Sequence, residues 1–229
     1  MTSHLKSGSY TVASVVARRA PAAATVSRGL YRNGIKRVFD VLFVLLSAPI
    51  TLPLIGFIML IAACDGVSPF YTQLRVGRGG RSFKLLKIRT MVLDSDALLE
   101  AHLAENPQAC AEWDRTQKLK NDPRITRIGK ILRKSSLDEL PQFWNVLMGD
   151  MSLIGPRPMM VEQKALYPGM AYYGLRPGIT GSWQVSDRNE SSFAARAKFD
   201  TDYDNNLSLM TDLDIFVRTI GVVLRCTGY

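Results

Sequence analysis

The segment Val41–Cys64, with the sequence VLFVLLSAPITLPLIGFIMLIAAC, decides the fold class because it runs for 24 residues without a charge. In a helix, at about 1.5 Å per residue, it is just long enough for a bilayer core of about 30 Å. Pro49 and Pro53 lie in the middle of the run, where each removes a helix hydrogen bond. Ser47 or Thr51 is placed to bond the freed carbonyls. The pattern predicts a membrane helix broken at its prolines.

Positive charge flanks this apolar run on both sides. Four basic residues precede it: Arg28, Arg32, Lys36 and Arg37. Six follow it: Arg75, Arg78, Arg81, Lys84, Lys87 and Arg89. No straight span keeps both groups on the cytoplasmic side, whereas a helix that returns to the same face does. We therefore predict a re-entrant membrane helix over residues 34–65, with a straight span as the alternative. Asp40 is expected to be neutralised by Lys36 and Arg37, which lie four and three residues before it.

The composition limits which side chains could carry out catalysis. The chain has 229 residues, is 47% hydrophobic and carries a net charge of +9. Its three cysteines are widely spaced, which argues against a disulfide framework or a zinc ribbon. His4 and His102 are the only histidines, so triads and metal sites that depend on histidine are disfavoured. Any catalysis must use carboxylates and basic groups.

The charge is concentrated in the first part of the chain. Residues 1–93 hold thirteen Lys or Arg and two Asp, which gives +11. Because this excess adjoins the apolar run, it favours membrane lipids or a phosphate substrate as partners over nucleic acid. No zinc finger or aromatic RNA-binding motif accompanies it. Residues 1–33 are rich in Ala, Ser, Thr and Arg without a sustained period, and we predict a disordered basic N-terminal tail there.

The remaining segments predict a small β-hairpin among helices. Residues 70–90 form two β-rich runs around a Gly-Arg turn, with Lys87 and Arg89 on the strand face opposite Ile88. Helices are expected over residues 94–113, broken near Pro107, and over 125–134, 143–148 and 211–225. Another should run from a cap at Ser191 or Ser192 to about Asp204. The apolar stripe of the last helix suits the core or a membrane surface, and the core is the more common outcome.

Two adjacent carboxylates, Asp138 and Glu139, follow a strongly basic segment in the stretch Ser135–Gln142, SSLDELPQ. Ser136 and Glu139 fit a capping box, and Pro141 makes Asp138 an alternative cap. In either arrangement both acids lie at a helix N-terminus, which favours the ionised form. Neighbours on a helix point in different directions, so one acid could attack phosphorus while the other binds a metal. Capping remains the alternative to catalysis.

Several motifs in order resemble one family, the monotopic polyprenyl-phosphate phosphoglycosyl transferases, also called bacterial sugar transferases. The matching stretches are Lys36–Asp40 with the proline-broken helix, Gln73–Gly77, Lys87–Met91, Ser136–Gln142, Asn145–Pro158 and Arg176–Gly181. Together they cover nearly everything after residue 33. Two departures are Ala48 before Pro49, where relatives often have serine, and the loop Ser186–Asn189, which reads SDRN rather than SGRN.

The resemblance implies a fold class and a reaction. The fold would be α+β, mainly helical and monotopic, with the re-entrant helix, the hairpin, amphipathic interfacial helices and a catalytic domain over residues 66–229. Asp138 would displace UMP from a UDP-hexose, with galactose or glucose as the sugar, and pass the hexose phosphate to undecaprenyl phosphate. Glu139 and Asp138 would hold Mg²⁺, while Lys87, Arg89 and Arg157 would bind phosphates.

By the same resemblance, the protein would start exopolysaccharide or O-antigen repeat units on the cytoplasmic face of the bacterial inner membrane. The sequence is compatible with a homo-oligomer. The rival interpretation is a non-enzymatic, membrane-tethered scaffold that binds lipid or polyanions, for which the basic clusters and the apolar helix would suffice. That interpretation gives no role to Asp138 and Glu139.

Overall fold

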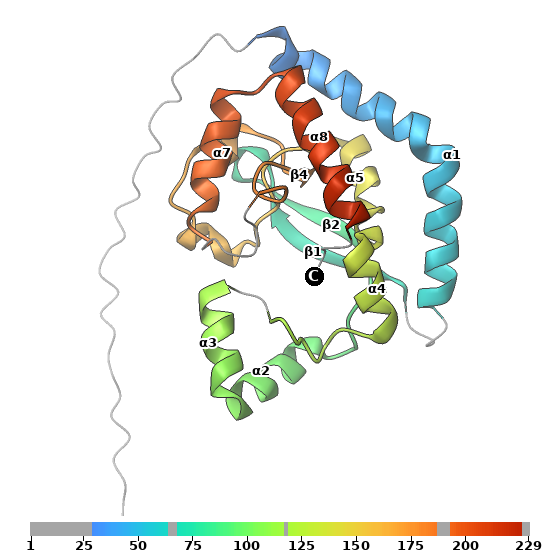
Figure 1. Cartoon of the computed structure of the whole chain (residues 1–229), viewed down its shortest axis with the longest axis vertical. Helices are drawn as coiled ribbons and strands as arrows, with labels where there is room; N and C mark the ends of the chain where they lie inside the picture. The colour runs from blue at the N-terminus through green and yellow to red at the C-terminus, as the bar shows by residue number, and fades with distance from the viewer. Residues whose placement is uncertain (1–28, 64–67, 117–118, 187–192, 226–229) are drawn as a thin grey trace, which may run out of the picture.

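The computed structural model describes residues 29–63, 68–116, 119–186 and 193–225, and in that part the fold is mainly helical with two small sheets (Figure 1). The helices are α1 (Lys36–Ala62), α2 (Ser95–Glu105), α3 (Pro107–Thr116), α4 (Arg127–Ser135), α5 (Gln142–Met148), α6 (Ala171–Gly174), α7 (Arg196–Asn205) and α8 (Leu209–Leu224). The strands are β1 (Phe70–Val76), β2 (Ser82–Ile88), β3 (Ser152–Ile154) and β4 (Gly178–Thr180). The α+β class with a hairpin is therefore confirmed. Most of the predicted tail over residues 1–33 lies outside the described residues.

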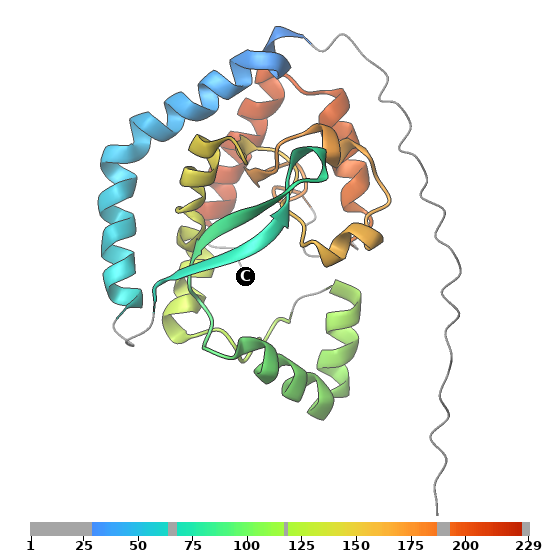
Figure 2. The same ribbon diagram turned by 180° about the vertical axis from the view of Figure 1, so that it is seen from behind.

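The apolar helix α1 bends but does not break. It stays helical over 27 residues with Pro49 and Pro53 inside it, and both views show one ribbon that bends near its middle (Figures 1 and 2). Ser47 and Thr51 donate to the carbonyls of Val44 and Ser47, each at 3.1 Å. These are not the carbonyls that the prolines free. The predicted break is therefore wrong, because the two missing hydrogen bonds produce only a bend.

Both ends of α1 contact the rest of the fold. Near its start, Asp40 is buried and accepts from Ser152 Oγ at 2.7 Å and from the Leu153 amide at 3.0 Å. Near its end, Ile58 and Ala62 pack in one buried cluster with Ile88 and Leu132. Between these two ends, Leu46, Ile50 and Leu52 are exposed.

The contacts of Asp40 differ from the prediction. Lys36 Nζ instead donates to Asp212 Oδ2 of α8 at 2.6 Å, and Arg37 donates to the carbonyls of Val146 and Leu147 at the end of α5. Lys36 nevertheless favours the ionised form of Asp40 as a nearby positive charge, as predicted, whereas Arg37 does not act on Asp40 and is held by the carbonyls at the end of α5.

The hairpin is confirmed, and its register places the basic side chains. β1 and β2 are antiparallel, with Tyr71 opposite Lys87 and Arg75 opposite Phe83. Alternation along β2 puts Phe83 and Leu85 on the same face as Lys87. Phe83 and Leu85 are buried. The expectation that Lys87 lies on the polar face is therefore wrong, since both faces of β2 contact other parts of the fold.

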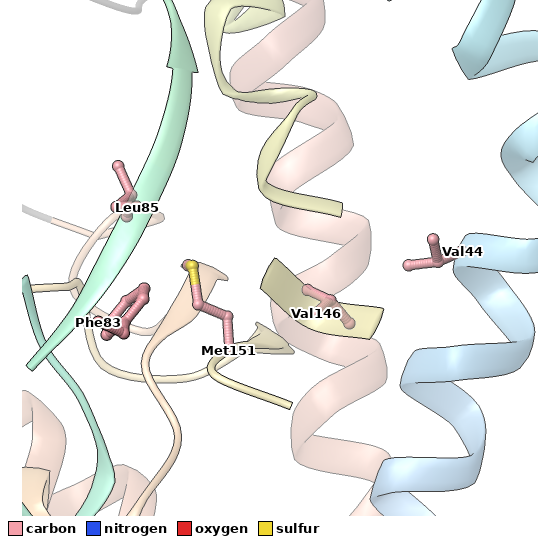
Figure 3. Packing of buried hydrophobic residues seen from close by; sticks show 5 residues of the cluster. All are labelled: Val44, Phe83, Leu85, Val146 and Met151. Carbon is pink, nitrogen blue, oxygen red and sulfur yellow. The ribbon is translucent and has the colours of Figure 1, made fainter. Parts of the chain in front are cut away.

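A compact apolar core fixes β2 against two helices. Its buried members are Val44, Phe83, Leu85, Val146 and Met151. Figure 3 shows that they come from α1, β2, α5 and the segment after α5, and that their side chains converge between these elements. Burying such side chains stabilises each by about 1.5–3 kcal/mol. The core thereby determines the position of the strand that carries Lys87.

The loop that carries Arg157 between Pro156 and Pro158 follows β3 and is pinned by a parallel pairing of β3 with β4. Gly155 donates to the Thr180 carbonyl at 2.9 Å, and Gly178 donates to the Pro156 carbonyl at 2.8 Å. A Cβ on Gly155 would lie 2.4 Å from the Arg176 carbonyl oxygen, so only glycine allows this close backbone approach. The glycines on both strands therefore set where Arg157 lies.

The positions of the surface helices agree with the predictions, but the burial of the apolar stripe on α8 does not. The break at Pro107 is confirmed between α2 and α3, and α4 begins after Thr126, whose hydroxyl accepts from Gly129 N at 2.9 Å. In α8, Ile215 is buried, whereas most of the predicted stripe is exposed: Leu213, Val217, Ile220, Val223 and Leu224. The core assignment of that stripe is therefore wrong. The start of α7 has no side-chain cap at Ala195, and the predicted caps lie outside the described residues.

Candidate active site

Asp138 and Glu139 lie in a short 3-10 turn, Leu137–Glu139, between α4 and α5. Ser136 before the turn has φ 58° and makes no side-chain capping bond. Pro141 occupies the N-cap position of α5, also without a side-chain bond. Both capping hypotheses are therefore wrong, because the proline moves the helix start beyond the two acids. Neither carboxylate is engaged in capping a helix.

The two carboxylates share one cationic partner. Lys87 Nζ lies 2.7 Å from Glu139 Oε1 and 3.6 Å from Asp138 Oδ2. Asp138 is only 5% exposed, whereas Lys87 and Glu139 are half-buried. The arrangement gives one acid that is withdrawn from water and one that is accessible, and both face the same positive charge.

Burial decides the protonation of Asp138. Desolvation raises the pKa of Asp138 above its ordinary value, and the negative charge of Glu139 raises it further. The positive charges of Lys87 and Arg133 act in the opposite direction. The sequence-based expectation that a helix N-terminus keeps this acid ionised is thus wrong, since there is no regular helix start at Asp138. Nearby cations are what favour its anionic form.

Arg133 is a contributor that we did not select from the sequence. It lies near the end of α4, and its Nε donates to Thr90 Oγ1 at 2.8 Å. That bond holds the guanidinium on the side of Asp138, toward which it acts as a positive charge. Its place in the basic run ahead of Asp138 was a visible signal, but eight basic residues share that run. Only the fold distinguishes Arg133 from the others.

Asn145 positions the strand that carries Lys87. This buried side chain accepts from the Leu86 amide at 3.0 Å and donates to the Lys84 carbonyl at 2.8 Å. Both bonds join α5 to the outer edge of β2. Because α5 directly follows the turn with Asp138, Asn145 fixes the strand and the turn relative to each other.

A pocket lined in part by Glu139 collects three of the seven predicted site residues. Its lining comes from β1, β2, the turn, α5, the loop at Arg157 and β4: Arg75, Leu85, Lys87, Glu139, Gln142, Arg157, Pro158 and Ile179. Lys87, Glu139 and Arg157 are therefore brought together as the sequence predicted. Arg75 was not selected from the sequence, although it lies in the quoted motif Gln73–Gly77.

Two groups of predicted site residues lie elsewhere. Arg89 Nη2 donates to the Ala62 carbonyl at the end of α1, at 3.2 Å, and Arg89 does not line the pocket. Pro49 and Pro53 are in the middle of α1, where they shape the apolar helix. The contact of Arg89 suits a residue that satisfies and neutralises a helix C-terminus.

The residues at this site fit a partial magnesium site. In the described part of the chain, no three acidic, histidine or cysteine side chains come together as a metal-binding group. Asp138 and Glu139 nevertheless face a common cation, the ammonium of Lys87. Mg²⁺ is commonly held by one or two carboxylates together with substrate phosphates and water. The donor set thus suits an ion that arrives with a phosphate ligand.

The match to known proteins covers the site and most of the fold. Residues 31–226 match the family described as bacterial sugar transferase. The chain belongs to this family. Among its relatives is the UDP-galactose-lipid carrier transferase of Erwinia amylovora, 49% identical over 196 residues, which are 85% of this chain and 41% of that protein.

Two further members of the bacterial sugar transferase family show how much of each relative the chain spans. The exopolysaccharide production protein ExoY of Rhizobium meliloti is 47% identical over 84% of this chain and 87% of that protein. The undecaprenyl-phosphate galactose phosphotransferase of Salmonella typhimurium is 44% identical over 85% of this chain and 41% of that protein. The chain thus spans less than half of the two larger relatives and most of ExoY.

Proposed function

We propose that this protein is a phosphoglycosyl transferase that moves hexose 1-phosphate from a UDP-hexose to undecaprenyl phosphate. The products are UMP and a lipid-linked diphosphohexose, the starting unit of an exopolysaccharide or O-antigen repeat. The proposed sugars are galactose, which appears in the names of two relatives, and glucose. The observation that carries the proposal is the buried Asp138 next to Glu139 and Lys87 in a member of a sugar transferase family.

In the first step, a carboxylate oxygen of Asp138 attacks the β-phosphorus of the UDP-hexose. The bond between that phosphorus and the oxygen bridging to the α-phosphorus breaks, and UMP leaves with the electron pair. The product is a hexose phosphate esterified to Asp138. Burial, which raises the pKa of Asp138, also removes water that would hydrolyse this ester. Lys87 favours the attacking anion and offsets charge on the phosphoryl oxygens.

In the second step, a phosphate oxygen of undecaprenyl phosphate attacks the same phosphorus and Asp138 leaves as a carboxylate. Splitting the transfer into two displacements lets one pocket serve a soluble donor and a lipid acceptor in turn. Arg157 would bind the phosphates in both steps. It lines the pocket, and its loop is fixed by the prolines beside it and by the contacts of Gly155 and Gly178.

Glu139, with Asp138, would hold Mg²⁺. When bound, the ion would neutralise phosphate charge and so lower the barrier to displacement. Glu139 is the more accessible of the two acids, which suits a metal ligand, whereas the buried Asp138 suits a nucleophile. The two proposed roles, metal ligand for Glu139 and nucleophile for Asp138, thus follow the difference in burial between the two side chains.

We propose a re-entrant path for α1 at the cytoplasmic face of the inner membrane. In the described residues, one helical stretch, Tyr31–Ala62, is long and apolar enough to cross a membrane. Apolar side chains along its middle are exposed, among them Leu46, Ile50 and Leu60. Its two ends both contact the domain that carries Asp138. A bent helix with both ends on one body is consistent with entry and return on one side.

The reaction is tested by UMP release. Purified protein in detergent, with Mg²⁺ and undecaprenyl phosphate, should release UMP from a UDP-hexose and form a chloroform-soluble labelled lipid. A panel of UDP-sugars in the same assay identifies the donor. A non-enzymatic membrane scaffold would release no UMP from any donor, and that outcome would replace the proposal.

A further inference from the structure

Arg75 is held in place next to the loop that carries Arg157. Its Nη1 donates to the Pro158 carbonyl at 3.2 Å, and its Nη2 donates to Gln73 Oε1. Arg75 and Arg157 line the same pocket as Lys87. The hairpin register explains this placement, because Arg75 and Lys87 lie on the same face of the β1–β2 sheet. Two guanidinium groups thus lie beside the carboxylate pair.

Arg196, the first residue of α7, does not line this pocket but is close enough to Arg157 and Arg75 to feel their positive charge. Its guanidinium carbon lies 4.2 Å from the ring centroid of Trp183 and 4.6 Å from that of Phe193. Stacking on aromatic faces orients a guanidinium while its N–H edges stay available to a ligand. Such rigidity reduces the entropy lost when an anion binds.

The three arginines repel one another without a full set of counter-charges. Burial and repulsion from Arg157 lower the pKa of Arg75 to about 10, and burial with repulsion from Arg157 and Arg75 lowers that of Arg196 to about 9. Asp200 offsets part of the charge on Arg196. Within the described residues, neither Arg75 nor Arg196 is in a salt bridge.

In the part of the chain that the structure describes, Arg75 and Arg196 each also have a hydrogen-bond donor without a partner. The Nε atoms of Arg75 and Arg196 are buried and have no hydrogen-bond partner among the described residues. A buried donor without an acceptor is costly, and a buried charge without a counter-charge is more so. The three guanidinium groups carry +3, and the two carboxylates that act on them, Asp200 and Glu139, carry −2 when ionised, so positive charge remains in excess. The complement of this cluster is an anion with several acceptor oxygens.

We propose that Arg75, Arg157 and Arg196 form an anion subsite beside Asp138 and Glu139 that binds the phosphate groups of a substrate. The inference rests on the proposed function and adds Arg75 and Arg196 to its machinery. Two substrates carry this chemistry: the diphosphate of the nucleotide sugar and the terminal phosphate of the polyprenyl acceptor. Near neutral pH each bears about two negative charges.

Inorganic diphosphate, without divalent cations, is the probe for the subsite. It should raise the thermal unfolding temperature of the wild-type protein in detergent. In Arg75→Gln and Arg196→Gln the apparent Kd for diphosphate should rise on the order of 10- to 100-fold. Arg81→Gln, which changes an exposed arginine in the turn of the same hairpin, is the matched control and should keep the wild-type shift. A wild-type protein that shows no shift, or variants that keep it, would overturn the proposal.

Steady-state kinetics distinguish the two sources of phosphate. If the subsite holds the donor, both glutamine variants raise the KM for UDP-hexose about 10-fold or more and leave the KM for undecaprenyl phosphate unchanged. If the variants instead raise the KM for undecaprenyl phosphate and leave the KM for UDP-hexose unchanged, the subsite binds the acceptor. Unchanged KM values for both substrates contradict a binding role for either arginine.

Two further measurements keep the result interpretable. If Arg196→Gln does not fold, Arg196→Lys tests the same point, because an ammonium keeps the charge but lacks the planar fork; an unchanged Kd for diphosphate would then count against the subsite. Labelling of Asp138 by the donor separates the two proposals. A wild-type protein that binds diphosphate but never becomes labelled refutes the covalent mechanism alone, whereas labelling without diphosphate binding refutes the subsite alone.

Discussion

The ammonium nitrogen of Lys87 on β2 lies 3.6 Å from a carboxylate oxygen of Asp138 in the turn before α5. Because Lys87 lowers the pKa of a buried acid that desolvation raises, we expect Lys87→Gln to move the acidic limb of the pH–rate profile to higher pH. The rate at neutral pH should fall about 100-fold, as for loss of one group that stabilises the transferring phosphoryl. Initial rates of UMP release between pH 5 and 9 measure both effects.

Lys84→Gln is the matched control, since Lys84 lies on the same strand with an exposed side chain. Its acidic limb should coincide with that of the wild-type protein. An acidic limb that does not move in Lys87→Gln would show that Lys87 has no influence on the ionisation of Asp138.

Asn145→Ala should destabilise the fold and the site together. The substitution leaves the Leu86 amide and the Lys84 carbonyl without their partner, and we expect a loss of about 2–4 kcal/mol in the free energy of unfolding. Asn206→Ala removes a side-chain bond to the Asp202 carbonyl at an exposed position and should cost less than about 1 kcal/mol. Denaturant titration in detergent compares the two. Equal losses would contradict the role assigned to Asn145.

Asp200 should make stability depend on pH. Burial raises its pKa to about 6, and Tyr167 donates to it at 2.7 Å. Its unfolded pKa is near 3.9, so the folded state binds the proton more tightly. The contribution to stability is present at low pH and is lost as pH rises through about 6; two units of pKa correspond to roughly 3 kcal/mol.

Asp200→Asn removes this ionisation and keeps an acceptor for Tyr167. Relative to the wild-type protein, the variant should therefore gain stability between pH 4 and pH 7.5. Unfolding temperatures of both proteins across that range provide the comparison. If the unfolding temperatures of the two proteins differ by the same amount at pH 4 and at pH 7.5, the result would argue against a raised pKa for Asp200.

The path of α1 is tested by chemical accessibility. In a background with the three native cysteines replaced, Leu30→Cys and Arg81→Cys report on the two sides of the apolar helix. In intact cells, a membrane-impermeant maleimide should modify neither cysteine, and it should modify both after the inner membrane is permeabilised. Labelling of one cysteine in intact cells would establish a straight span instead.

The sequence predicted those parts of the fold that local patterns determine. The hairpin follows from β-rich runs around a glycine turn, and the end of α5 at Gly149 follows from a residue that accepts a positive φ of 87°. Strand register and side-chain burial were harder to predict from the sequence. Leu85 and Lys87 share a strand face and both line the pocket, yet Leu85 is also buried in the apolar core, whereas Lys87 is half-buried.

For the candidate site, the sequence identified the residues with an unusual local context. Asp138, Glu139 and Arg157 stand out because adjacent acids follow a basic run and because prolines flank the arginine. Arg75, Arg133 and Arg196 do not stand out, since each is one of many basic residues. Phosphate binding by Arg89 stays a prediction, and Arg89 does not line the pocket. Its alternation with Lys87 suggested a shared role, but the strand ends between them, and Arg89 turns to the end of α1.

The covalent adduct on Asp138 is the most direct test of the account. A UDP-hexose with ³²P in the β-phosphate, added without undecaprenyl phosphate, should label the wild-type protein, and undecaprenyl phosphate should then discharge the label into lipid. Asp138→Asn, with an unchanged unfolding temperature, should take up no label. Persistent labelling of this variant, or lipid product from a wild-type protein that never carries the adduct, would contradict Asp138 as the nucleophile.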